Sequence, residues 1–239
     1  MSNIVNEFNK TFIRDNRYLV FLEGFKNTMV ITLIAVLIGI AIGTVVSLVH
    51  SLAQDYAKKK RKSLKGSLIK AFDKILSFYV ALMRGTPLAI QLTIMAFIIM
   101  AGYANKIVVC CLAFGINSGA YVSEVIRGGL EAVDIGQTEA GRSLGLSSLG
   151  TLRLIILPQA IKSILPALCN EGIAVLKETS IVGLISVVDL TRASDLVRSR
   201  TLSPYFPLIS VAIVYFVLVA GLSSLVSRLE RRLKQSDRG

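Results

Sequence analysis

The sequence predicts an all-α integral membrane protein with about five transmembrane helices and a cytoplasmic loop between the third and the fourth. Of its 239 residues, 53% are apolar and 18% are charged, whereas an average soluble domain carries roughly 25% charged residues. The apolar residues gather in long runs without a formal charge. This composition excludes intrinsic disorder, and three cysteines are too few for a disulfide scaffold.

Four charge-free runs mark candidate membrane spans. They cover residues 27–54, 85–105, 107–123 and 201–227. Because a spanning helix needs about 20 apolar residues, three of the runs are long enough and the run at 107–123 is marginal. We expect each of them to form one transmembrane helix.

A fifth apolar region, residues 154–188, completes the predicted set of spans. Four charged residues interrupt it: Lys162, Glu171, Lys177 and Glu178. We interpret it as a spanning helix with one polar face, the fourth in chain order.

The segment 67–84 has two possible interpretations. Its charged residues Lys70, Asp73 and Lys74 lie near one end, and its apolar residues recur at helical spacing. It is either an amphipathic helix at the membrane surface or the beginning of the second span.

The distribution of Lys and Arg predicts the orientation. The loops after the first and third spans and the C-terminal tail together hold roughly twice as many Lys and Arg as the opposite side. The basic run at 58–65 could bind nucleic acid, but beside a span we interpret it as a topology signal. We therefore expect an extracytoplasmic segment at 1–19 and a basic cytoplasmic tail at 229–239. We expect no cleaved signal peptide, because residues 1–27 contain acidic residues and lack a short apolar core.

The loop at about 131–158 is the most informative part of the chain. It has the spacing E-A-x4-G-x9-I-x-L-P, which predicts a helix–turn–helix at the membrane surface. We expect Gly145 to end the first helix in a left-handed conformation and Ser147 or Ser148 to cap the next. Pro158 is then placed in the first turn of the following span. From the residues alone, an ordinary surface turn is an equally good interpretation.

This spacing resembles the cytoplasmic coupling motif of permease subunits of ATP-binding-cassette (ABC) importers. Other segments are similar to the polar amino acid subfamily, whose members take histidine, glutamine or arginine: MRGTPL at 83–88, AYVSEVIRGG at 120–129, GQTEA at 136–140, NE at 170–171 and LKETS at 176–180. The resemblance covers nearly the whole chain, so we assign residues 20–228 to the transmembrane domain of such an importer.

The resemblance implies that the chain forms half of a translocation pore and that the loop 131–158, hereafter the coupling loop, sits on a separate ATPase. The implied coupling residues are Glu139, Ala140, Gly141, Leu144, Gly145 and Leu146. The chain departs from the family in carrying Gly141 where an alanine is usual, which costs up to about 1 kcal/mol in a helix and predicts a less rigid one. It also carries Glu178 where aspartate is common, so this carboxylate reaches farther.

The sequence contains no Gly-Lys dipeptide and therefore no phosphate-binding loop of the G-x4-G-K-[ST] type. We expect ATP and magnesium to bind the partner ATPase, and we expect no cofactor, catalytic residue or metal ligand in this chain. The single histidine, His50, is predicted to lie at the membrane interface. The chain is accordingly expected to be a transport subunit and not an enzyme.

Charged residues inside a span are costly and by default suggest function. Glu171 and Glu178 are two helical turns apart and share a face of a continuous helix. With Asn170 and Thr179 they are candidates for contact with the ammonium group of an amino acid. In the structural alternative, Lys177 neutralises one of the glutamates or lies with Glu178 at the outer interface.

Arg84 and Thr86 are further candidates for lining the pore. The alternative, which we favour for Arg84, is anchoring at the cytoplasmic interface. Glu124 and Arg127 are three residues apart and are expected to pair with each other.

The leading hypothesis is a multi-pass permease subunit in a bacterial inner or plasma membrane that imports polar amino acids. Its expected partners are two copies of an ABC ATPase, a second permease subunit (identical or homologous), an extracytoplasmic binding protein, the amino acid and the lipid bilayer, but no nucleic acid. One alternative keeps the architecture with another solute, such as a peptide, a sulfur compound or an opine. The other is an ATP-independent carrier, although such carriers often contain internal repeats and none is visible here.

Overall fold

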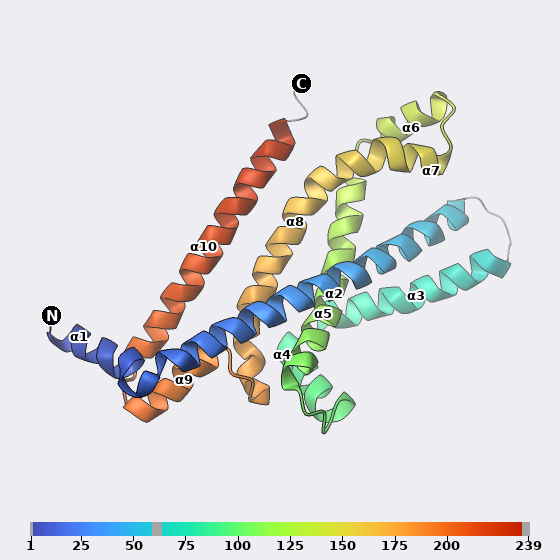
Figure 1. Ribbon diagram of the computed structural model, residues 1–239. Coiled ribbons are helices and arrows are strands. Elements are labelled where there is room, and N and C mark those ends of the chain that lie inside the picture. The colour runs from blue at the N-terminus through green and yellow to red at the C-terminus, as the bar shows by residue number, and fades with distance from the viewer. Residues whose placement is uncertain (1, 59–63, 236–239) are drawn as a thin grey trace. The chain divides into compact units, whose positions relative to one another are not determined.

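The computed structural model describes residues 2–58 and 64–235, and every regular element in these ranges is a helix (Figure 1). Most of the basic run at 58–65 and the end of the tail lie outside the described residues. The N-terminal segment consists of three short helices: α1 (Ser2–Phe8), η1 (Asn9–Ile13) and η2 (Arg14–Asn16). The long helices are α2 (Tyr18–Lys58), α3 (Leu64–Gly85), α5 (Lys106–Glu131), α8 (Leu157–Glu178) and α10 (Phe206–Gln235).

Shorter helices connect the long ones. They are α4 (Leu88–Ile94), η3 (Met95–Ile99), α6 (Ile135–Ser143), α7 (Ser148–Thr151), η4 (Leu152–Ile156), η5 (Thr179–Ile185) and α9 (Leu190–Thr201). Asparagine or aspartate side chains cap the N-termini of three of the helices by accepting hydrogen bonds from backbone N–H groups. Asn105 does so at α5, Asp134 at α6 and Asp189 at α9.

The spans agree with the predicted number. In the described residues, four stretches are long and apolar enough to cross a membrane: Tyr18–Gln54, Lys106–Glu131, Ser148–Ile185 and Phe206–Leu233. A bent pair of helices, Leu64–Gly85 and Leu88–Ile99, gives five if it counts as one span. The all-α membrane fold with about five spans is therefore confirmed.

The predicted bounds of the second span were wrong. The charge-free run 85–105 does not form one helix: α3 ends at Gly85, and α4 and η3 extend only to Ile99. Pro87 has no N–H to donate and disfavours helical geometry at Thr86, which accounts for the break. The segment 67–84 belongs to the continuous helix α3, the first half of the bent pair.

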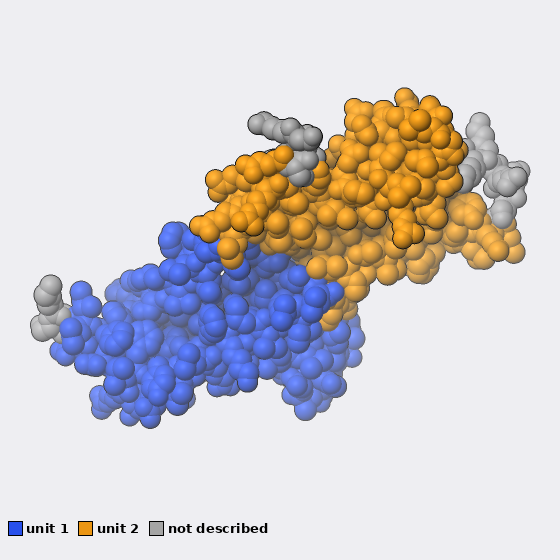
Figure 2. Space-filling view, turned by 45° about the horizontal axis from the view of Figure 1, so that its top comes forward, with its two compact units in different colours: residues 1–37, 86–115, 172–222 blue, residues 38–85, 116–171, 223–239 orange. Residues whose placement is uncertain are grey.

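The chain divides into two compact units, shown in different colours in Figure 2. Unit 1 comprises residues 1–37, 86–115 and 172–222. One of its buried clusters joins α2, α4, η3, α5 and η5 around the fully buried Phe114 and Leu92. A second cluster surrounds α9, where Val197 and Phe21 pack beside Phe12 of the N-terminal segment.

Polar contacts complement this packing in unit 1. The Asn27 side chain donates to the carbonyl oxygen of Val188 at 2.8 Å, and the Thr28 hydroxyl accepts from the N–H of Leu190 at 3.4 Å. These bonds join the N-terminal half of α2 to the beginning of α9. Gly24 permits the approach, because a Cβ there would lie 2.5 Å from the carbonyl oxygen of Asp189.

Unit 2 comprises residues 38–85, 116–171 and 223–239. Its α2 and α5 segments meet through small residues. A Cβ added to Gly39 would lie 2.8 Å from Ser118 Oγ, and one added to Gly43 would lie 2.5 Å from Val122 Cγ1. On the opposite helix, a Cβ on Gly119 would meet Ile42 at 2.8 Å. The two helices are thus in close backbone contact.

Candidate coupling loop and solute-binding residues

The first turn of the coupling loop has the predicted geometry. Helix α6 begins at Asp134, whose carboxylate accepts from the N–H of Gly136 at 2.6 Å. It ends at Ser143, and Gly145 two residues later turns the chain with a φ of +83°. The N–H of Leu146 donates to the carbonyl oxygen of Gly141 at 3.1 Å, and Arg142 Nη1 donates to the carbonyl oxygen of Leu146 at 2.8 Å. The left-handed glycine and these two bonds define the turn.

The second half of the loop leads directly into α8. Ser147 caps α7 by accepting from the N–H of Gly150 at 3.0 Å, and Pro158 lies in the first turn of α8. Both expectations are confirmed. Gly141 is buried against this half: a Cβ there would lie 2.7 Å from Thr151 Cγ2 and 2.8 Å from Ile155 Cδ1. The glycine that we expected to loosen the helix therefore allows α6 to pack closely on η4.

The tip of the loop exposes apolar side chains. Leu144, one of the predicted coupling residues, is 81% exposed, while Ile135 and Leu149 are 75% and 72% exposed. Glu139 and Ala140 are also exposed, and Leu146 is half-buried. Large apolar side chains that stay exposed on a loop are candidates for a protein contact surface.

Glu171 is the predicted pore residue with the most defined environment. It is half-buried on α8 and accepts from the Ser118 hydroxyl of α5 at 2.9 Å. Gly39 of α2 leaves the space that this hydroxyl occupies. The two neighbouring helices thus orient the carboxylate.

The other α8 candidates have different surroundings. Asn170 and Glu178 are exposed, whereas Thr179 is fully buried. The Thr179 hydroxyl donates to the carbonyl oxygen of Leu176 at 2.7 Å. Because α8 is continuous to Glu178, Glu171 and Glu178 lie on the same side of one helix, as expected.

Arg84 and Thr86 lie on either side of the break after α3. Arg84 Nη1 contacts Glu124 Oε2 at 3.1 Å, and its guanidinium lies 5.7 Å from the centre of the Tyr121 ring. The exposed Thr86 is held locally, since Gln91 Nε2 donates to its hydroxyl at 2.8 Å and to its carbonyl oxygen at 3.1 Å.

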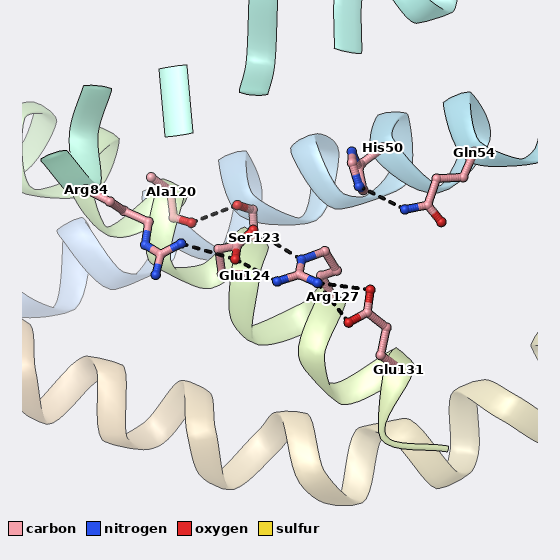
Figure 3. Close-up of polar contacts among 8 residues, drawn as sticks. All are labelled: His50, Gln54, Arg84, Ala120, Ser123, Glu124, Arg127 and Glu131. Atoms are coloured by element: carbon pink, nitrogen blue, oxygen red, sulfur yellow. Dashed lines mark hydrogen bonds and ion pairs between the residues drawn. The ribbon is translucent and has the colours of Figure 1, made fainter. Parts of the chain in front are cut away.

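Glu124 is the centre of a chain of ion pairs (Figure 3). Arg127 contacts both of its oxygens, through Nη2 at 2.9 Å and Nε at 3.3 Å. Arg127 Nη1 also reaches the carboxylate of Glu131 at 2.8 Å. The predicted pairing of Glu124 with Arg127 is confirmed, and Arg84 and Glu131 extend it. This chain of ion pairs ends at Glu131, shortly before Asp134, which caps the coupling helix α6.

His50 has a carboxylate neighbour that the sequence did not indicate. Its Nδ1 lies 2.9 Å from Asp73 Oδ1 of α3, and its Nε2 lies 3.0 Å from Gln54 Nε2 (Figure 3 shows the contact with Gln54). These contacts join the C-terminal part of α2 to α3.

The family model that describes the inner membrane component of binding-protein-dependent transport systems matches residues 66–235. The chain belongs to this family. The match includes the coupling loop, α8 and the ion-pair chain, and the permease is therefore a multi-pass component of an inner membrane.

The permease has curated relatives that cover most of its length. The arginine transport system permease protein of Bacillus subtilis is 38% identical over 176 residues, which are 72% of this chain and 80% of the relative. The L-cystine transport system permease protein of the same organism is 35% identical over 170 residues, 70% and 73% of the two chains. The glutamine transport system permease protein of Escherichia coli is 33% identical over 160 residues, 65% and 73%.

Solved structures agree with this assignment. A chain in the crystal structure of an amino acid ABC transporter with histidines is 38% identical to the permease, with a TM-score of 0.79 over 90% of this chain and 94% of that chain. A chain of an inward-facing methionine ABC transporter is 15% identical, with a TM-score of 0.74 over 92% and 98%. The second likeness shows the fold alone.

Sequence reasoning missed several residues of these sites. Ile135 and Leu149 carry a local signal, because each is a large apolar residue between polar or small neighbours, Asp134 and Gly136 for the first and Ser148 and Gly150 for the second. Ser118 carries none, since it meets Glu171 only through the packing of α5 on α8.

Asp189 is a further residue that was missed, and it lies outside the spans. Its side chain is fully buried at the beginning of α9. Burial raises the pKa of this carboxyl, and hydrogen bonds from the N–H groups of Arg192 and Thr191 oppose the rise. The Tyr215 hydroxyl lies 3.4 Å from Asp189 Oδ2. The Asp189 carboxyl is therefore a titratable group buried inside unit 1.

Proposed function

We propose that this permease is the membrane subunit of an ATP-driven importer of polar amino acids and forms half of its translocation pore. The observation that carries the proposal is the coupling loop, a buttressed turn that exposes apolar side chains at its tip. The named relatives and the structural neighbour, which are amino acid transport components, support the choice of cargo.

The proposed coupling residues are Glu139, Ala140, Gly141, Leu144, Gly145 and Leu146. Leu144 and the exposed residues beside it contact a separate ATPase, where ATP and magnesium bind and hydrolysis takes place. Gly145 and Gly141 keep the loop compact through the left-handed turn and the contact with Thr151. A compact loop transmits movement of the ATPase to α5 and α8, the helices at its two ends.

The proposed solute contacts are Glu171, Glu178, Asn170, Thr179, Arg84 and Thr86. Glu171 supports this assignment best, because a half-buried carboxylate in a span is costly without a function and Ser118 fixes its orientation. The ammonium group of an amino acid is a suitable partner for this carboxylate.

The assembly that we propose contains two permease subunits, identical or homologous, two ATPase subunits and one extracytoplasmic binding protein. The N-terminal segment then lies outside and the C-terminal tail in the cytoplasm. A cysteine introduced at Ile4 should react with an impermeant thiol reagent added outside intact cells, and a cysteine introduced at Leu144 should not. The reverse pattern would contradict this orientation.

The test of the function is uptake of a panel of labelled amino acids into proteoliposomes that contain this permease, its ATPase and its binding protein, with and without ATP. We expect ATP-dependent uptake of one group of polar amino acids, lost when the permease is omitted. If the binding protein stimulates ATP hydrolysis but no amino acid is taken up, the proposed cargo would be wrong and the assignment as an importer would stand. Uptake without the ATPase would favour a carrier.

A further inference from the structure

The C-terminal end of α10 presents a basic face to its surroundings. Leu225, Arg228 and Arg232 follow one another at spacings of three and four residues, so they share one face of the helix. Leu225 is 59% exposed, and both arginines are exposed. Arg231 is exposed as well and lies three residues from Arg228, beside the same face. We call the three arginines the α10 basic face.

The opposite face of this part of α10 packs against the protein. Val226, Glu230 and Leu233 also recur at helical spacing, and Val226 is buried while the other two are half-buried. Glu230 lines a cavity of unit 2 together with Lys162 of α8. It is the single acidic residue in α10, so the carboxylate of this helix lies on the side away from the α10 basic face.

The arginines of the α10 basic face have donors available for a ligand. Within residues 2–58 and 64–235, no ion pair includes Arg228, Arg231 or Arg232. Arg231 Nε donates to the carbonyl oxygen of Ser227 at 3.3 Å, which leaves its two terminal amino groups. A guanidinium carries five N–H donors in a planar fork that fits phosphate. A phosphate group from outside the chain can therefore bind without displacing a carboxylate.

The α10 basic face begins where the helix leaves the hydrocarbon of the membrane. Residues 201–227 carry no charge, and about 20 helical residues cross the hydrocarbon layer, so a helix that begins at Phe206 reaches the headgroups at about residue 226. Arg228 and Arg232 are separated by a rise of about 6 Å. This matches the thickness of roughly 5–7 Å of one headgroup layer, and the arginines therefore lie at the depth of the lipid phosphates.

The charge of the face distinguishes between phospholipids. A zwitterionic headgroup carries an ammonium beside its phosphate, and three arginines without a nearby carboxylate repel that ammonium. An anionic headgroup avoids this repulsion, and each arginine at such a surface strengthens binding by roughly fivefold. The orientation of the chain requires positive charge near the span, but it does not require that the charge be gathered on one exposed face of a helix.

We propose that the α10 basic face is a binding site for an anionic phospholipid, with the arginines on the phosphate and Leu225 against an acyl chain. This inference rests on the proposed function for the leaflet, which is the cytoplasmic one when the C-terminal tail lies inside. The bound lipid fixes the end of α10 at the membrane surface, while the face that carries Glu230 stays packed in unit 2.

The test exploits the absence of tryptophan from the sequence. The substitution L225W introduces a single tryptophan beside the α10 basic face. The full-length variant is placed in vesicles of phosphatidylcholine and phosphatidylglycerol, and either one or the other lipid carries brominated acyl chains, which quench tryptophan fluorescence on contact. We expect the quenching to give a relative affinity of roughly tenfold or more in favour of phosphatidylglycerol. The control is L33W, at a 63% exposed leucine of α2, which should show no preference.

Arginine variants in the L225W background locate the site. R228Q/R232Q should reduce the preference to that of L33W. The matched control R198Q/R200Q removes the same number of charges from exposed arginines on α9 and should keep the preference. R228K/R232K keeps both charges but loses the planar forks, so it should keep only part of the preference. A single symmetric peak in size-exclusion chromatography checks that each variant is folded.

Several results would overturn the inference. Equal quenching of L225W by both lipids, or an unchanged preference in R228Q/R232Q, would show that the arginines select no lipid. Full preference in R228K/R232K would reduce the site to diffuse attraction. Quenching by neither lipid would show that protein covers this face, as a second permease subunit would. Loss of the preference in millimolar inorganic phosphate would assign the arginines to a soluble anion.

None of these results bears on transport, so the inference can fail while the proposed function stands. Conversely, the complete assembly could take up no amino acid with ATP while L225W keeps its preference for phosphatidylglycerol. In that case the proposed function would fail and the lipid site would stand.

Discussion

Gly141 of α6 lies so close to Thr151 that a Cβ on the glycine would be 2.7 Å from the threonine Cγ2. G141A should therefore push α6 away from α7 and η4 and reduce ATP-dependent uptake, although alanine favours the helix by up to about 1 kcal/mol. T151S removes the opposing methyl group, so the double variant G141A/T151S should recover part of the uptake. Full activity of G141A alone would show that the contact is unimportant for coupling.

Gly145 is the left-handed residue of the coupling loop, with a φ of +83°. G145E should uncouple ATP hydrolysis from transport, because a bulky charged residue is strained there by about 1–2 kcal/mol. G145N is the matched control, since asparagine tolerates this conformation, and it should keep most of the coupling. Uptake and ATPase activity are measured together in proteoliposomes. Normal transport by G145E with normal insertion would show that our coupling assignment is wrong.

Leu144 is 81% exposed and is expected to be buried by the ATPase. Burying a leucine contributes about 1.5–3 kcal/mol, so L144D should weaken the binding of the ATPase to the solubilised permease by roughly tenfold or more. The control is L202D, at an 85% exposed leucine outside the loop, which should leave the affinity unchanged. Equal affinities of wild type and L144D would remove this residue from the interface.

Glu171 accepts the hydroxyl of Ser118 and is the best supported of the proposed solute contacts. E171Q should change the rate of uptake or the order of preference across a panel of cationic and neutral amino acids, because the carboxylate charge is lost. S118A keeps the charge and removes its orienting bond, so it should have a smaller effect in the same direction. Identical kinetics of E171Q and wild type would make this glutamate a structural residue.

Asp189 predicts a pH dependence of stability. Its pKa is raised by burial, so the folded state binds this proton more tightly than the unfolded state does. The resulting stabilisation is present below the ordinary aspartate pKa of about 4 and is lost as the pH rises through the raised value. D189N keeps a capping side chain without the titration. From about pH 4 upward, the melting temperature of wild type should therefore fall relative to that of D189N, and parallel curves would contradict the buried titration.

The coupling loop could be predicted because its structure is local. A glycine that adopts positive φ, a serine that caps and a proline that begins a helix each act within a few residues, and Gly145, Ser147 and Pro158 do so in the structure. The bend of the second span was also signalled locally, by Pro87, but the count of uncharged residues concealed it. Length and charge do not report where a helix breaks.

The contacts between helices could not be predicted from the sequence. Ser118 with Glu171, Arg84 with Glu124 and His50 with Asp73 are distant along the chain. Which faces of two helices meet depends on the packing of all the side chains between them, and no short pattern encodes it. The same reason explains why Glu124 was assigned to its neighbour Arg127 and not to Arg84.

The glycines between α2 and α5 have a mechanical consequence for unit 2. At Gly39 and Gly43 the backbone of α2 meets α5 directly, so there is no layer of long side chains that could change rotamer and let one helix slide past the other. The unit 2 segments of these two helices should therefore behave as a single rigid strut during the transport cycle. Displacement must instead arise at joints such as the break after α3, where Pro87 is extended and a Cβ on Gly85 would have no close neighbours.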